Sequence, residues 1–183
     1  HESAAGTIPG LDALDVAVKV QRPEAVRQIA LDWTCASLAL EALELYWRNF
    51  RPSGFEADLG LIADEIASNL FQELNYKQEA KNAAAFVDSL KFLGFVDAPH
   101  SVDALTTPCV LTTSWVNGRH LKDLTEAEGL RLTTMAVEAC TASLVLTGYV
   151  HADPHEGNLM LCDETGRLVF LDFGLMSDVE GSI

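Results

Sequence analysis

Basic residues are scarce in this sequence. Twelve lysines and arginines stand against 27 aspartates and glutamates, so the formal net charge is −15 at pH 7. A surface of this charge repels phosphate backbones and anionic lipid headgroups. The composition therefore argues against a nucleic-acid partner and against electrostatic docking on a membrane, but it does not exclude apolar docking.

Long apolar runs and paired cysteines are missing as well. No stretch of about 18 consecutive apolar residues occurs, so the sequence predicts no transmembrane helix. Its cysteines lack C-x-x-C spacing, which is typical of reduced thiols in an intracellular protein. They are Cys35, Cys109, Cys140 and Cys162. Because the chain begins with His1 and not Met, we expect a fragment, in which missing targeting signals mean little.

The first half of the chain predicts a strand followed by a helical hairpin. A chain of 183 residues is long enough for one domain, or most of one, with a sizeable core. Residues 15–21 alternate apolar and polar side chains with Lys19 at the centre, which predicts a strand. After Pro23 apolar residues recur at steps of three and four, which predicts a helix with an ordinary core face. These are Val26, Ile29, Trp33, Ala36, Leu40, Leu43 and Trp47. A capping box at Ser53 and Glu56 begins a second such helix, so we expect an antiparallel hairpin over residues 23–70.

Two further helices and two strands are expected after the hairpin, and the first strand signal lies at residues 94–96. A stripe at helical spacing predicts one helix, with Glu79 at the edge of that stripe. Its members are Tyr76, Ala80, Ala83, Val87 and Leu90. Residues 110–116 favour a strand that ends at the turn Asn117-Gly118. A capping box at Thr125 and Glu128 begins a helix that ends at Gly148. Its apolar residues Leu130, Val137 and Leu144 recur every seven positions.

The most informative stretch lies near the C-terminal end. His151, Asp153 and Asn158 form the spacing H-x-D-x-x-x-x-N, and Asp172-Phe173-Gly174 follows. Kinases use this spacing to place a catalytic base, a metal-binding amide and a metal-binding carboxylate around a nucleotide triphosphate. Two apolar runs flank residues 163–166, so we expect a β-hairpin that brings Asn158 and Asp172 to one Mg²⁺ ion. Asp153 would then accept or orient the attacking hydroxyl.

Two plainer readings of the same stretch remain open. His151, Asp153 and His155 carry imidazole and carboxylate groups that suit zinc or iron, so they could form a transition-metal site. Alternatively, these residues only complete turns. The nucleotide reading is favoured because the two halves of the motif support each other.

A nucleotide site of this kind also needs a lysine and a glutamate. Lys19, at the centre of its strand, is the candidate that grips the phosphates. Glu79 is the candidate that pairs with Lys19, and both are counted with Asp153 as catalytic residues. The weaker candidate for the same position is Glu73. An exposed lysine and a solvated helix face are the plain alternatives.

The chain resembles the UbiB-type atypical kinases, the aarF-domain branch of the protein-kinase-like fold. The strings that carry the resemblance are VAVKVQRP, ELNYKQEAKNAAAF, VLTTSWVNG, HADPHEGN and VFLDFG. The resemblance implies an α+β, two-lobe kinase-like fold in a single incomplete domain. Residues 1–113 would form the N-terminal lobe with its helical insertion at 23–70, and residues 114–183 part of a mostly helical C-terminal lobe. It also implies ATP and Mg²⁺ as ligands of Lys19, Glu79, Asn158 and Asp172, with Asn158 and Asp172 holding the metal.

The chain departs from the family pattern in several places. An acidic E-x-D pair is expected where the chain has Glu73 and Asn75, so the second carboxylate is lost. Glu156 replaces the proline of HPGN, and Ser114 replaces the glutamate of E-W-x-x-G. The family's K-x-G-Q helix and Ala-rich loop are not recognisable before Lys19.

The resemblance implies an ATP-dependent kinase or ATPase that supports isoprenoid-quinone biosynthesis in a mitochondrion, plastid or bacterium. Lipids or quinone precursors and other proteins of quinone biosynthesis would be its partners. Two alternatives remain open: a small-molecule kinase of the aminoglycoside or choline type, and a non-catalytic nucleotide-binding regulator. The helical insertion favours the first reading, while Asn75 favours the regulator.

Overall fold

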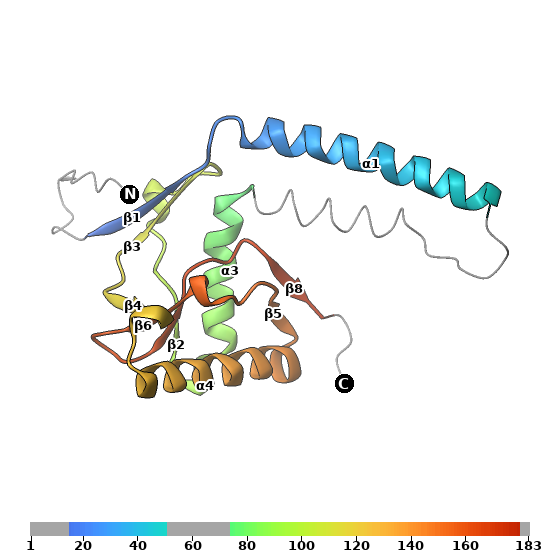
Figure 1. Ribbon diagram of the computed structural model, residues 1–183. Helices are drawn as coiled ribbons and strands as arrows, with labels where there is room; N and C mark the ends of the chain where they lie inside the picture. Colours follow the sequence, from blue (N-terminus) through green and yellow to red (C-terminus); the bar gives the residue numbers. More distant parts are fainter. Residues whose placement is uncertain (1–14, 51–73, 180–183) are drawn as a thin grey trace. The chain divides into compact units, whose positions relative to one another are not determined.

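The computed structural model describes residues 15–50 and 74–179 (Figure 1). The chain divides after Val20 and before Asn75 into two compact units. Unit 1 comprises the chain up to Val20 together with the chain from Asn75 onward, and unit 2 comprises Gln21–Leu74. The division between an N-terminal lobe at 1–113 and a C-terminal lobe at 114–183 stays a prediction.

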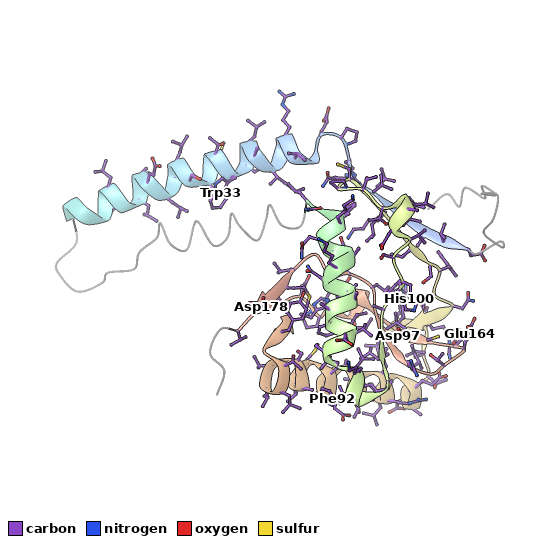
Figure 2. The ribbon with its side chains drawn as sticks, turned by 180° about the vertical axis from the view of Figure 1, so that it is seen from behind. Trp33, Phe92, Asp97, His100, Glu164 and Asp178 are labelled. Carbon is purple, nitrogen blue, oxygen red and sulfur yellow. The ribbon has the colours of Figure 1, made fainter. Side chains whose placement is uncertain are left out.

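Unit 2 contains the predicted long helix, α1, over Ala25–Phe50. Along the stripe that was expected to be core, Ile29, Trp33 (labelled in Figure 2) and Leu40 are half-buried, while Val26 and Leu43 are exposed. The partner helix of the expected hairpin, with its capping box at Ser53 and Glu56, lies outside the described residues. The hairpin therefore stays a prediction.

The strand that was predicted to carry Lys19 is present and belongs to a small antiparallel sheet of unit 1. Strand β1 (Val16–Val20) pairs antiparallel with β3 (Val110–Ser114), and Lys19 lies opposite Leu111. Val18 and Val20, on the other face of β1, are exposed. Because successive side chains of a strand alternate between its faces, this register puts Lys19 on the face that meets the rest of unit 1.

A second sheet has the strand order β2-β7-β6-β4. The predicted hairpin is confirmed: β6 (Leu159–Cys162) pairs antiparallel with β7 (Leu168–Phe170), and the connecting turn has Gly166 at φ +64°. β4 (Gly118–His120) pairs antiparallel with β6, and β2 (Val96–Asp97) pairs parallel with β7. The strand signal at residues 94–96 is confirmed by β2, which begins at Val96, whereas the edge strand β4 was not predicted. A third, two-stranded sheet joins β5 (Tyr149–His151) to β8 (Met176–Asp178).

Two helices frame the core of unit 1. Figure 1 shows α3 (Tyr76–Ser89) upright in the middle of the unit, with α4 (Glu126–Ala142) across its base. The inner face of α3 differs by one position from the predicted stripe. Tyr76, Glu79 and Phe86 are buried on α3, whereas Ala80, Ala83 and Val87 are only half-buried. Phe86 and Leu90, both fully buried, anchor this face in the core.

Both ends of α4 are as the sequence predicts. The Thr125 hydroxyl accepts the Glu128 amide, and the Glu128 carboxylate accepts the Thr125 amide, which completes the capping box. After Ala142 the chain forms one wide turn, Ser143–Thr147, and stops at Gly148 with φ +70°. Arg119 on β4 ties this helix start to the β6–β7 turn, because its guanidinium bonds Glu128 at 2.9 and 3.1 Å and Asp163 at 2.8 Å.

The side of α4 that packs in the core is not the side that carries the seven-residue series. The buried side chains are Leu132, Met135, Ala136, Ala139 and Ala142. Leu130, Val137 and Leu144 form an outer strip instead and are 70%, 61% and 54% exposed. The exposed threonines beside this strip turn their hydroxyls inward: Thr134 donates to Leu130 O, and Thr141 to Val137 O. The strip is therefore less polar than its composition indicates.

One helical run in the described part of the chain, Glu126–Thr147, is long and apolar enough to cross a membrane by length and composition. One side of α4 packs in the core, and a buried core helix meets the same criterion. The run is therefore weak evidence for a membrane span.

Candidate active site

Lys19 and Glu79 form the ion pair that was expected between them. The Lys19 ammonium lies 2.8 and 3.0 Å from the two carboxylate oxygens of Glu79, although the residues are 60 positions apart. Glu79 is only 4% exposed. A buried carboxylate needs a charged partner, so the ion pair explains why α3 can carry a glutamate on its inner face. Tyr76 adds a second contact, because Lys19 Nζ lies 5.0 Å from the centre of its ring.

Asp172 joins this pair from the D-F-G segment. Its Oδ2 lies 3.2 Å from Lys19 Nζ, and its Oδ1 accepts the Gly174 amide at 3.0 Å. Burial by itself would raise the pKa of Asp172, but the charge of Lys19 and the hydrogen bond from Gly174 lower the pKa below its usual value. Burial would likewise lower the pKa of Lys19, but the hydrogen bond and charge of Glu79 outweigh it and raise the pKa. Both groups are therefore charged at neutral pH.

Asn75 has a structural role at the position where the family pattern has an acid. It is the N-cap of α3, and its side chain accepts the Lys77 amide at 3.2 Å. An asparagine is among the best residues for this position, because its oxygen satisfies an amide that the helix leaves unpaired. Glu73, the weaker candidate for the lysine partner, lies outside the described residues.

Hydrogen bonds within the loop hold the segment that carries Asp153. The Asn158 side chain donates from Nδ2 to Asp153 O at 3.3 Å, and the His155 amide donates to the same oxygen at 2.9 Å. Leu171 N donates to Asn158 O at 2.9 Å, so Asn158 lies across the hairpin from the residue before Asp172. The Asp153 carboxylate is exposed, with the His155 ring 3.7 Å away. The structure thus brings Asn158 and Asp172 to one end of the hairpin.

His151 connects the segments that carry Asp153 and Asp172. Its ring is buried, with Nε2 2.7 Å from Asp172 O, and Nδ1 accepts the Asp153 amide at 3.2 Å. Nδ1 is therefore the unprotonated nitrogen, and Nε2 carries the proton donated to Asp172 O. Burial lowers the pKa of His151, so the ring is neutral at pH 7.

The transition-metal reading of His151, Asp153 and His155 is wrong. A metal needs a free imidazole nitrogen, and both nitrogens of His151 are engaged within the protein. In residues 15–50 and 74–179 no three or more histidine, cysteine, aspartate or glutamate side chains gather as a metal site.

The remaining donors suit a hard cation. Asp172 offers an ionised carboxylate, and the amide of Asn158 uses its nitrogen within the loop, which leaves Oδ1 as its acceptor. Oxygen ligands of this kind, completed by water and phosphate, are what Mg²⁺ takes at nucleotide sites. The residues present therefore fit the metal that a kinase-like site requires.

A cluster of aromatic rings supports the site from inside. The ring of Phe86 on α3 lies 5.1 Å from Phe170, 5.7 Å from Phe173 and 6.0 Å from His151, centre to centre. These distances are typical of favourable tilted and edge-to-face contacts. The cluster joins the helix of Glu79 to the segments of Asp153 and Asp172.

The family assignment follows from this arrangement together with the match along the chain. The ABC1 atypical kinase-like domain matches residues 7–182. The chain belongs to the ABC1 atypical kinase-like family. The resemblance to aarF-domain kinases in its motifs is thereby confirmed, and so is the α+β kinase-like fold.

The chain is similar to several curated proteins. The chain is 39% identical over 171 residues to the uncharacterized protein sll0005 of Synechocystis, and the match covers 90% of the chain and 24% of that protein. It is 34% identical over 179 residues to the chloroplastic protein ACTIVITY OF BC1 COMPLEX KINASE 8 of Arabidopsis thaliana, covering 94% and 23%. The chain thus spans about a quarter of the length of these relatives.

A solved structure from Mycobacterium tuberculosis has the same fold. The complex of Rv3197 with erythromycin from Mycobacterium tuberculosis matches with a TM-score of 0.71 at 28% identity. The match covers 93% of this chain and 42% of that chain.

Sequence reasoning found the charged residues of the site but missed those that hold them. Tyr76, Asn82 and Phe86 lie on the same helix as Glu79 and contact Lys19, Phe173 and the ring cluster, and none was predicted to contribute to the site. The spacing itself held the information for Phe86, because it lies seven residues, or two helical turns, after Glu79.

Proposed function

We propose that this chain is the ATP-binding part of an atypical kinase or ATPase that carries out Mg²⁺-dependent phosphoryl transfer or ATP hydrolysis. The observation that carries the proposal is the position of Lys19 between Glu79 and Asp172. A lysine held by a buried glutamate, next to a metal-binding aspartate, is what a nucleotide triphosphate site requires.

Each residue has a role in this proposal. Glu79 fixes the direction of Lys19, whose ammonium grips the phosphates. Asp153 accepts the proton of the attacking hydroxyl or water as the new oxygen–phosphorus bond forms. The bond to the oxygen between the β and γ phosphates breaks at the same time, and ADP leaves with that electron pair. His151 holds the Asp153 and Asp172 segments at a fixed separation through its two ring nitrogens.

Asn158 and Asp172 are the residues that would hold the metal. When bound, Mg²⁺ supplies positive charge that balances the phosphate oxygens. Asp172 is suited to this role because its carboxylate is ionised at neutral pH. Asn158 is suited to it because its side-chain nitrogen bonds Asp153 O, which leaves the side-chain oxygen to accept the metal.

We propose a role in isoprenoid-quinone biosynthesis, and the names and sources of the relatives favour a plastid or cyanobacterial location over a mitochondrial one. Arabidopsis relatives carry names that include "chloroplastic", and others come from Synechocystis. Quinone precursors or other lipids, and proteins of the same pathway, are the partners that go with this role. The family match makes an aminoglycoside- or choline-type kinase the less favoured alternative.

A non-catalytic nucleotide-binding regulator is the second candidate. It is favoured by Asn75, which caps a helix where the family pattern has a carboxylate. The retained Lys19, Asp153, Asn158 and Asp172 favour an active enzyme instead.

Substitutions in the full-length protein separate these functions. Asp172→Asn should remove the Mg²⁺-dependent part of the thermal stabilisation by ATP, and Lys19→Ala should weaken ATP binding. Asp153→Asn should lower kcat by about 10² to 10⁴-fold with little change in nucleotide affinity, because a general base acts on the chemical step. ATP binding without turnover in the unsubstituted protein would favour the regulator. No ATP binding at all would contradict both proposals.

A further inference from the structure

Asn82 lies on α3 one helical turn after Glu79 and makes three side-chain hydrogen bonds. Its Nδ2 donates to Phe173 O at 3.0 Å. Its Oδ1 accepts from the Tyr149 hydroxyl at 3.2 Å and from Gln78 Nε2 at 2.9 Å. The amide of Asn82 therefore connects α3 to the D-F-G segment and to β5.

The bond to Phe173 closes a ring of contacts around the proposed metal ligand. Lys19 bonds both Glu79 and Asp172. Glu79 and Asn82 are three residues apart and so lie on the same face of α3. Asn82 in turn bonds the residue that directly follows Asp172. Helix α3 thus holds Asp172 from two sides, through Lys19 and through the carbonyl of Phe173.

These two connections respond differently to a bound nucleotide. Under the proposed function the Lys19 ammonium bonds phosphate oxygens and the Asp172 carboxylate bonds a metal, so their mutual contact at 3.2 Å competes with both ligands. The bond from Asn82 uses a backbone carbonyl and neither charged group. It is retained while Lys19 and Asp172 exchange partners.

We propose that Asn82 is the positioning residue that keeps Asp172 in place for the metal once Lys19 is engaged with the nucleotide. This inference rests on the proposed function. An asparagine is suited to the position because it donates to the Phe173 carbonyl and accepts from the Tyr149 hydroxyl with one planar group. An aspartate of the same size keeps the acceptor but has no proton to donate.

The chain offers a matched set of variants. Asn82→Ala removes all three bonds, and Asn82→Asp removes the bond to Phe173 while it keeps acceptors for Tyr149 and Gln78. Tyr149→Phe is the control, because it removes one bond of Asn82 and leaves the bond to Phe173 in place. A residue that only supports stability would give similar results for Asn82→Asp and Tyr149→Phe.

The first measurement is the Mg²⁺ requirement for thermal stabilisation by ATP in the full-length protein. We expect Asn82→Asp and Asn82→Ala to raise the half-saturating Mg²⁺ concentration about tenfold, which corresponds to the loss of one hydrogen bond. Tyr149→Phe should stay within about twofold of the unsubstituted protein. An unchanged Mg²⁺ requirement in Asn82→Asp, or an equal increase in Tyr149→Phe, overturns the inference.

A second measurement needs no ligand. The Gly174 amide bonds Asp172 Oδ1, so its hydrogen exchange reports how firmly the segment is held. Exchange over residues 172–175 should be faster in Asn82→Asp than in Tyr149→Phe. If the unsubstituted protein does not respond to ATP and Mg²⁺, the proposed function fails, and the exchange result alone decides whether Asn82 holds the segment. If both Asn82 variants fail to fold while Tyr149→Phe folds, the role of Asn82 is general stability and the inference is overturned.

Discussion

Phe86 should contribute far more to the stability of unit 1 than Phe92, although both are phenylalanines six residues apart. Phe86 is 0% exposed and contacts Phe170, Phe173 and His151, whereas Phe92 is 57% exposed (labelled in Figure 2). Replacing a buried phenylalanine by alanine costs about 3–5 kcal/mol. Because each favourable ring pair adds about 0.5–1.5 kcal/mol, we expect Phe86→Ala near the upper end of that range.

Phe92→Ala is the control for the stability cost of losing a phenylalanine side chain. Phe92 removes only part of its area from water and leaves no internal cavity when shortened, so Phe92→Ala should cost about 1 kcal/mol. In a domain of about 150–250 residues, each kcal/mol corresponds to a shift in the melting temperature of about 2–4 °C. We therefore expect the melting temperature of unit 1 to fall about 10 °C further in Phe86→Ala than in Phe92→Ala.

The assay should report the stability of unit 1 separately from that of the rest of the full-length protein. Hydrogen exchange of the amides in α3 and in the β6–β7 hairpin, measured through a urea series, provides this. Phe86→Leu is the milder variant if Phe86→Ala does not fold. Equal losses for Phe86→Ala and Phe92→Ala, or a loss below about 1.5 kcal/mol for Phe86→Ala, would refute the view that the ring cluster stabilises the site.

Three further predictions concern α4. Thr125→Ala removes the side chain that caps the helix and should cost about 1 kcal/mol in urea unfolding, whereas Thr125→Ser should cost little. Gly148→Ala has room for its methyl group but must keep φ at +70°, so it should cost about 1–2 kcal/mol in urea unfolding. Glu128 has its pKa lowered to about 2 by the hydrogen bonds from Arg119 and Thr125, against an ordinary 4.5. Its stabilising effect should be complete above about pH 4.5 and lost as the pH falls towards 2, so Glu128→Gln should reduce the acid dependence of stability in that window, and an unchanged acid unfolding curve would contradict this.

The charged residues of the site were predictable because their spacing is tied to chemistry. Asp153, Asn158 and Asp172 keep fixed intervals, and the hairpin between them follows from two apolar runs and a glycine turn. The inner face of α3 was less predictable. A glutamate at helical spacing is normally solvated, so a search for an apolar stripe places Glu79 outside the buried face, and the partner that makes its burial possible is 60 residues away.

The pattern of apolar residues along α4 does not show which side of the helix is buried. Apolar residues occur on both sides of this helix, and the side that is buried is rich in alanine. Small side chains let the helix approach the sheet closely. Leu130 and Val137 are larger and more apolar, so a search for a core face would select them first. The contact of Asn82 could not be predicted from neighbouring residues either, because its partner is a backbone carbonyl 91 residues later in the chain.

The outer strip of α4 has a consequence for the behaviour of this chain in solution. Leu130, Val137 and Leu144 tend to bring molecules together, while the net charge of −15 keeps them apart. At low ionic strength the repulsion acts over a long range, about 30 Å at 0.01 M salt, and it shrinks to about 8 Å at 0.15 M. Added salt should therefore promote self-association of this chain, and dilute buffer should keep it dispersed.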